Sequence, residues 1–175
     1  MERGELYSLI IRYFLLALFG TFNLAIFYLI FSPLTVYPSY FFISKIFENS
    51  ILISTDPYAI LFKGYIAKII PACIAGSAYY LLLILNLTTP MQLKRRIYSL
   101  LFLFSSFLII NIARIVLFAT LVPIGFEYFD VTHELTWYLG STIMVVFIWF
   151  VNVLIFKISA IPVYSDLKSI YSDIK

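Results

Sequence analysis

Three side chains in this 175-residue chain have the chemistry of a nucleophilic active site. Cys73 is the only cysteine, His133 is the only histidine, and Arg114 lies inside a long apolar run. A thiolate is a strong nucleophile, an imidazole exchanges protons near neutral pH, and a guanidinium stabilises negative charge. A nucleophile, a proton carrier and a fixed cation together can support acyl transfer through a thioester.

Arg114 is the most informative of the three, because residues 109–118 are otherwise apolar except for Asn111. An arginine near the centre of a bilayer costs about 2.5–3.5 kcal/mol on insertion scales, so it usually faces a polar cavity or a partner. A snorkelling anchor is the alternative, but Pro123 ends the run about 13 Å further along a helix, which is far for an anchor. We therefore favour a functional role. Asn111, three residues earlier on the same helical face, is expected to hold the guanidinium.

Cys73 and His133 each have an ordinary structural interpretation as well. A cysteine in an apolar helix is usually a small packing residue, and a histidine before a helix is usually solvated. The surroundings of Cys73 favour a site, because Gly76 and Ser77 are small and leave room for another chain to approach. Glu134, next to His133, is one of several nearby acidic residues that can orient the imidazole.

The composition indicates which elements position these residues. The chain is 63% hydrophobic and 12% charged, with a mean hydropathy of +1.01, whereas soluble domains are about 45–50% apolar and about 25% charged. These values exclude a soluble fold and predict an all-α, polytopic membrane bundle that forms a single domain over 1–175. Runs of about 20 apolar residues predict about four transmembrane helices, at 13–31, 69–87, 98–122 and 135–156.

The segment 33–68, between the first two predicted spans, is expected to lie at the outer face. Residues 40–47 can form an interfacial helix, and residues 51–53 and 58–62 have the pattern of short extended segments. The alternative is a fifth, re-entrant helix. Lys45 and Glu48 favour the outer-surface interpretation, because charged residues are costly in mid-bilayer.

The distribution of basic residues predicts the orientation of the bundle. With a cytoplasmic N-terminus, eight Lys and Arg residues lie inside and three lie outside, and this bias is the one that the positive-inside rule requires. The inside set is Arg3, Arg12, Lys94, Arg95, Arg96, Lys157, Lys168 and Lys175, and the outside set is Lys45, Lys63 and Lys68. Both termini are then cytoplasmic, and Cys73, Arg114 and His133 all fall in the outer half of the membrane.

At these positions the chain resembles the exosortase/archaeosortase family of membrane cysteine enzymes. The resemblance rests on Cys73 followed by a small residue and Gly76, on Asn111 three residues before Arg114, and on His133 at the start of the next helix. The resemblance covers roughly residues 50–150. The residue after the cysteine is Ile74, whereas many members of the family have serine there. The resemblance implies that Cys73 attacks a backbone carbonyl, that His133 acts as general acid and base, and that Arg114 stabilises the oxyanion or the thiolate.

The resemblance also implies the partners. The substrate would be a surface protein with a C-terminal sorting signal made of a short motif, a transmembrane helix and a basic cluster. A thioester acyl-enzyme would form at the outer face of the cell membrane and would pass to an amine acceptor, which a lipid head group can supply, or to water. No metal, cofactor or nucleic acid is expected.

Two other classes of function are left open by the residues alone. The first is a non-enzymatic bundle, such as a transport subunit or an assembly scaffold, in which Arg114 pairs helices and Cys73 only packs. The second is an intramembrane protease that uses the same nucleophile with water as acceptor. The sequence contains neither Gly-x-Ser-x-Gly nor His-Glu-x-x-His, which are typical of serine- and metal-dependent hydrolases.

Overall fold

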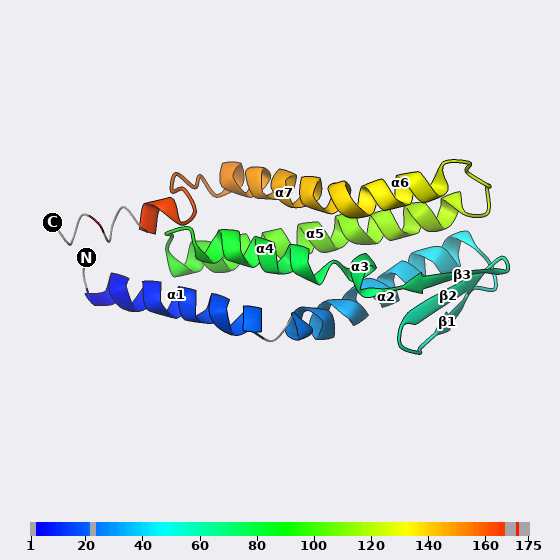
Figure 1. Ribbon diagram of the computed structural model, residues 1–175, viewed down its shortest axis with the longest axis horizontal. Coiled ribbons are helices and arrows are strands. Elements are labelled where there is room, and N and C mark those ends of the chain that lie inside the picture. Colours follow the sequence, from blue (N-terminus) through cyan, green and yellow to red (C-terminus); the bar gives the residue numbers. More distant parts are fainter. Residues whose placement is uncertain (1–2, 22–23, 167–170, 172–175) are drawn as a thin grey trace.

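The computed structural model describes residues 3–21, 24–166 and 171. It is mostly helical, with one small antiparallel sheet. Figure 1 shows that the helices run side by side along the long axis of the molecule. The start of α1 and the segment that follows α7 lie at one end, and the sheet lies at the other.

The first two helices are α1, Arg3–Thr21, and α2, Ala25–Ile46. Leu24, at the start of α2, has a left-handed backbone with φ of 60°. The structure therefore differs from the predicted span 13–31, which is divided between two helices. The prolines at 33 and 38, the first of which was expected to end the span, lie inside α2. Residues 40–46 are helical as expected, but they form the end of α2 and not a separate interfacial helix.

The sheet contains strands β1, Ile51–Ile53, β2, Tyr58–Phe62, and β3, Tyr65–Ile69, in that order. The first two strands confirm the extended segments predicted at 51–53 and 58–62. The third was not predicted. Lys63 and Gly64 connect β2 to β3 with φ values of 46° and 82°, and two positive φ values in a two-residue loop are typical of a type I′ hairpin turn.

Two helices replace the predicted span 69–87. Helix α3, Pro71–Ile74, is followed by Ala75 with a left-handed backbone at φ 57°, and α4 then runs from Gly76 to Leu87. A Cβ atom on Gly76 would lie 2.9 Å from the ring of Tyr28. The small residues around the break therefore admit a side chain of α2, where the sequence indicated only that some chain could approach.

The remaining helices agree better with prediction. Helix α5 is Leu93–Leu121, and α6, Phe129–Leu135, continues through a π-helical turn η1, Thr136–Gly140, into α7, Ser141–Ile155. The predicted spans 98–122 and 135–156 lie largely within these elements. In the described part of the chain, three helices are long and apolar enough to cross a membrane, namely α2, α5 and Phe129–Ile155. The stretch Pro71–Leu87 is shorter, so a fourth span remains a prediction.

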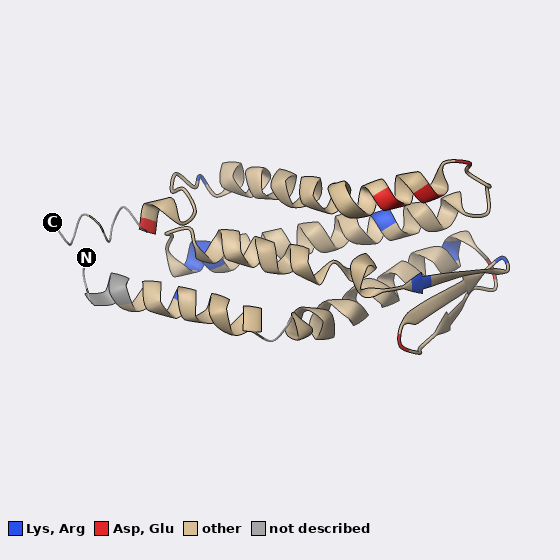
Figure 2. Ribbon diagram, in the orientation of Figure 1, with Lys and Arg blue, Asp and Glu red and all other residues tan. Residues whose placement is uncertain are grey.

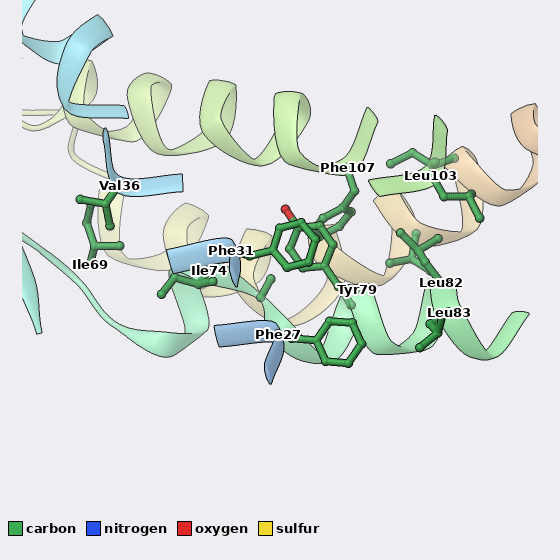
Figure 3. Close-up of a cluster of buried hydrophobic side chains, with 14 of the residues drawn as sticks. Phe27, Phe31, Val36, Ile69, Ile74, Tyr79, Leu82, Leu83, Leu103 and Phe107 are labelled. Atoms are coloured by element: carbon green, nitrogen blue, oxygen red, sulfur yellow. The ribbon is translucent and has the colours of Figure 1, made fainter. Parts of the chain in front are cut away.

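Aromatic rings form the centre of the bundle where α2, α4 and α5 meet. The rings of Phe31 and Tyr79 stack with centroids 3.5 Å apart, and Phe107 meets Tyr79 edge-on at 4.9 Å. Figure 3 shows these rings with Leu82 and Leu103 alongside. Many large apolar side chains point outward instead, including Leu29 at 78% exposure and Leu154 at 76%. An apolar surface of this kind suits a lipid environment.

Buried polar contacts hold together the end of the bundle opposite the sheet. Arg12 of α1 forms an ion pair of 2.9 Å with Asp166 and donates a hydrogen bond to the carbonyl of Leu87. Arg96 of α5 donates to the carbonyls of Asn86 and Thr89. Both arginines are buried, so these contacts provide the partners that buried charges require.

Candidate active site

The left-handed residue Ala75 exposes the backbone at Cys73. In an unbroken helix the carbonyl of Cys73 would accept a hydrogen bond from residue 77. Here it instead accepts hydrogen bonds from two side chains of α5, the Nδ2 of Asn111 at 2.8 Å and an Nη of Arg114 at 3.3 Å. The break in the helix and the two polar residues of α5 thus form one unit that fixes the backbone of the predicted nucleophile.

Arg114 links Cys73 to the last helix. Its other terminal nitrogen donates to the Oγ of Ser141 at 3.0 Å, and the side chain is half-buried. A guanidinium has five N–H donors in a planar fork. Two of them donate to acceptors within the described residues, which leaves donors for a bound group. Sequence reasoning missed Ser141, because a single serine at the start of an apolar helix carries no signal of its own.

Aromatic rings flank His133 on α6. Its ring stacks on Phe129 with centroids 5.6 Å apart, and it meets Phe118 of α5 edge-on at 5.1 Å. No hydrogen bond joins His133 to an acidic side chain among the residues that the structure describes. The sequence suggested that an acidic neighbour orients the imidazole. In the structure, the rings of Phe129 and Phe118 flank it instead. The sequence carried one indication of this contact: Phe129 lies four residues before His133, so the two side chains share one face of a helix.

Two adjoining cavities contain the predicted residues. One, of about 240 Å³, is lined by Cys73, Arg114 and His133 together with Glu134 and Trp137. Another, of about 360 Å³, shares Cys73, Arg114 and His133 and extends along β3. Residues from α3, α5 and α6 thus meet at the junction of two cavities, and Figure 2 shows a basic position of α5 beside an acidic position of α6. This is the convergence that the topology predicted, while the catalytic roles remain predictions.

The other expected supporting residues differ in their placement. Asn111, which was expected to hold the guanidinium of Arg114, is fully buried and donates to the carbonyl of Cys73 instead, and its Oδ1 has no partner within the described residues. Glu134 is exposed and borders the smaller cavity. Gly76 is buried beneath the ring of Tyr28, and Ser77 is exposed and lines neither cavity. Gly76 and Ser77 therefore belong to helix packing and to the surface.

A cavity lined by a thiol, an imidazole and a guanidinium can perform nucleophilic acyl transfer without another group. Within the described ranges, no group of three or more His, Cys, Asp or Glu side chains is placed to hold a metal ion. Comparison of the chain with protein-family models, with curated proteins and with solved structures gave no match.

Proposed function

We propose that this chain is a membrane-embedded cysteine transpeptidase that cleaves the C-terminal sorting signal of surface proteins and transfers them to an amine acceptor. The observation that carries the proposal is the meeting of Cys73, Arg114 and His133 around shared cavities. These residues come from three separate elements, and two of them are the only members of their type in the chain. The resemblance to the exosortase/archaeosortase family supports the same assignment.

The reaction follows from the chemistry of the three groups. The Sγ of Cys73 attacks the carbonyl carbon of the scissile peptide bond as His133 accepts the thiol proton, and the remaining N–H donors of Arg114 stabilise the resulting oxyanion. An oxyanion donor in a site that excludes water contributes about 3–4 kcal/mol. His133 then gives a proton to the leaving amine, and a thioester remains on Cys73. An incoming amine, made nucleophilic as His133 accepts its proton, attacks the thioester and releases Cys73.

We further propose that the protein resides in the cell membrane with both termini cytoplasmic and the site toward the outer face. The basic residues at the start of α5 support this, because they lie at the same end as the start of α1 (Figures 1 and 2) and basic residues favour the cytoplasmic side. Lys168 and Lys175, two of the eight basic residues expected on the cytoplasmic side, lie outside the described residues. The cavity of about 360 Å³ borders the sheet, which is at the opposite end.

Co-expression with candidate substrates tests the proposal. Each candidate carries a C-terminal motif, a helix and a basic tail, and its mass is compared between wild type, Cys73→Ala and Cys73→Ser. Loss of the tail with an added head-group mass, in wild type only, is expected for a transpeptidase. Loss of the tail alone would indicate a protease instead.

A matched control separates chemistry from folding. Ser105→Ala removes an exposed hydroxyl of α5 away from both cavities, so it should process substrates normally. Normal processing by either Cys73 variant would exclude Cys73 as the nucleophile. Unchanged substrates in every strain would support the scaffold alternative.

A further inference from the structure

The outer edge of β3 has backbone groups without partners. The order β1-β2-β3 leaves β3 at the edge of the sheet. A two-residue type I′ turn closes on a hydrogen-bonded pair, here Phe62 and Tyr65. Because antiparallel pairs alternate between bonded and non-bonded, the N–H and C=O groups of Ile66 and Lys68 point away from β2. In the described part of the chain, these four groups accept or donate no other hydrogen bond.

The larger cavity runs along this edge. It is lined by every residue of β3 from Tyr65 to Ile69. Successive side chains of a strand point to opposite faces, so a cavity that borders all five reaches around the outer edge of β3. Ile60 and Phe62 of β2 and Ile43 of α2 also line it, so it continues from this edge beneath the inner face of the sheet. Its far wall is formed by α5 and α6, and it also borders Cys73, Arg114 and His133. The free edge and the proposed catalytic groups therefore share one space.

We propose that the edge of β3 binds the substrate as an added β-strand, in the extended segment next to the scissile bond. This inference rests on the proposed function and concerns how its substrate is held. An unpaired strand edge is costly next to lipid unless it lines a cavity, and an extended peptide supplies the complementary donors and acceptors. A volume of about 360 Å³ is within the range of ligand pockets.

The charge of the cavity specifies the bound segment further. Its charged lining residues are Lys68 and Arg114, and no acidic residue lines it among the described ranges. The bound segment is therefore neutral or acidic, and a basic residue opposite Lys68 is disfavoured. Strand β3 leads through Ile70 and Pro71 directly to Cys73, so a peptide paired with Ile66 and Lys68 places its next residues at the thiol.

Pairing of this kind uses main-chain groups of every second substrate residue. Side chains of the bound segment then contribute less than its extended backbone. One site can hold different sequences, provided that no proline or N-methyl group replaces a bonded amide.

A peptide reagent tests the edge directly. The probe is acetyl-Val-Glu-Val-Ala chloromethyl ketone, which alkylates the Sγ of Cys73: an S–C bond forms, the C–Cl bond breaks, and chloride and the thiol proton are released. Acetyl-Ala chloromethyl ketone serves as the short reference, and iodoacetamide reports the bare reactivity of the thiol. Wild type should react at least about tenfold faster with the tetrapeptide reagent than with the short one.

Proline at the edge provides the matched pair of variants. Ile66→Pro removes one outward N–H without touching the β2–β3 ladder, and should lower the tetrapeptide preference about fivefold. Leu52→Pro removes an outward N–H from the opposite edge, because Leu52 pairs with Ile60, whose groups are bonded toward β3. It should leave the preference unchanged. Both variants should react with iodoacetamide at the wild-type rate, which verifies that the site is folded.

The outcomes separate the two proposals. No preference for the tetrapeptide, or the same preference in Ile66→Pro, would overturn strand addition even if substrate processing depends on Cys73. If Ile66→Pro fails to fold, N-methylation of alternate amides of the reagent replaces it on wild type, and loss of reactivity at every second position is the expected result. Normal substrate processing by Cys73→Ala would instead refute the proposed function while leaving the peptide preference intact.

Discussion

Replacing Asn111 with alanine tests whether the carbonyl of Cys73 must be held in place for the site to work. Asn111 is fully buried, and its Nδ2 donates to that carbonyl at 2.8 Å. The variant leaves the thiol, the guanidinium and the imidazole in the molecule. It removes the shorter of the two hydrogen bonds that fix the nucleophile's backbone.

The structure offers a matched control in Asn86→Ala. Asn86 is also fully buried, its Nδ2 donates one hydrogen bond of 2.7 Å, and its Oδ1, like that of Asn111, has no partner within the described residues. Loss of the bond costs about 1 kcal/mol, the lost packing costs about as much, and removing an unpaired oxygen offsets about 1 kcal/mol. Both variants should therefore lose about 1 kcal/mol of unfolding free energy.

Their activities should differ. A displacement of about 1 Å in a reacting group costs about 100-fold in rate, so Asn111→Ala should process substrate about 100-fold more slowly and Asn86→Ala at nearly the wild-type rate. Processing is followed by mass, and unfolding is followed by chemical denaturation in detergent. Equal loss of processing in both variants would refute the positioning argument, and so would normal processing by Asn111→Ala.

Three further changes test other parts of the molecule. Arg114→Lys keeps the charge but cannot make both bonds of the planar fork, so processing should fall about 100-fold or more, while the exposed Arg95→Lys should process normally; similar rates for the two would contradict this. Arg12→Ala leaves the buried carboxylate of Asp166 without its cationic partner and should lower the unfolding free energy by about 3–5 kcal/mol, measured by denaturant titration. The double variant Arg12→Met with Asp166→Leu should recover most of the loss. Gly76→Ala places a Cβ atom 2.9 Å from the ring of Tyr28 in α2 and should lower the unfolding free energy by about 1–3 kcal/mol. An unchanged thermal midpoint would show that this ring moves aside without cost.

Part of the site could be predicted because it follows from topology. Cys73, Arg114 and His133 lie near the same ends of successive apolar runs, and runs of bilayer length place such ends in one layer. The strands at 51–53 and 58–62 were predictable from β-branched and aromatic residues around a turn signal. The strand at 65–69 was not, because it merges into the next apolar run without a visible boundary.

The break at Ala75 had no local signal, because alanine has the highest intrinsic helix propensity. The ring of Tyr28 over Gly76 and the donors of Asn111 and Arg114 stabilise the break from outside the segment. Pro33 likewise indicated the end of a helix, yet α2 continues through it. Proline is tolerated in an apolar helix when its neighbours compensate for the missing hydrogen bond.

The π-helical turn η1 sets the rotational phase between α6 and α7. In a regular α-helix each residue turns the chain by about 100°, so His133 and Ser141 would differ by about 80°. A π turn accommodates one additional residue, and the offset becomes about 20°. The imidazole and the hydroxyl that accepts from Arg114 can then face the same side of one long helix. Loss of one residue from Thr136–Gly140 would restore a regular α-helix with seven steps between the imidazole and the hydroxyl, and would keep this phase. A regular α-helix over all the present residues would instead turn the proton carrier by about 100° away from the hydroxyl that accepts from the guanidinium.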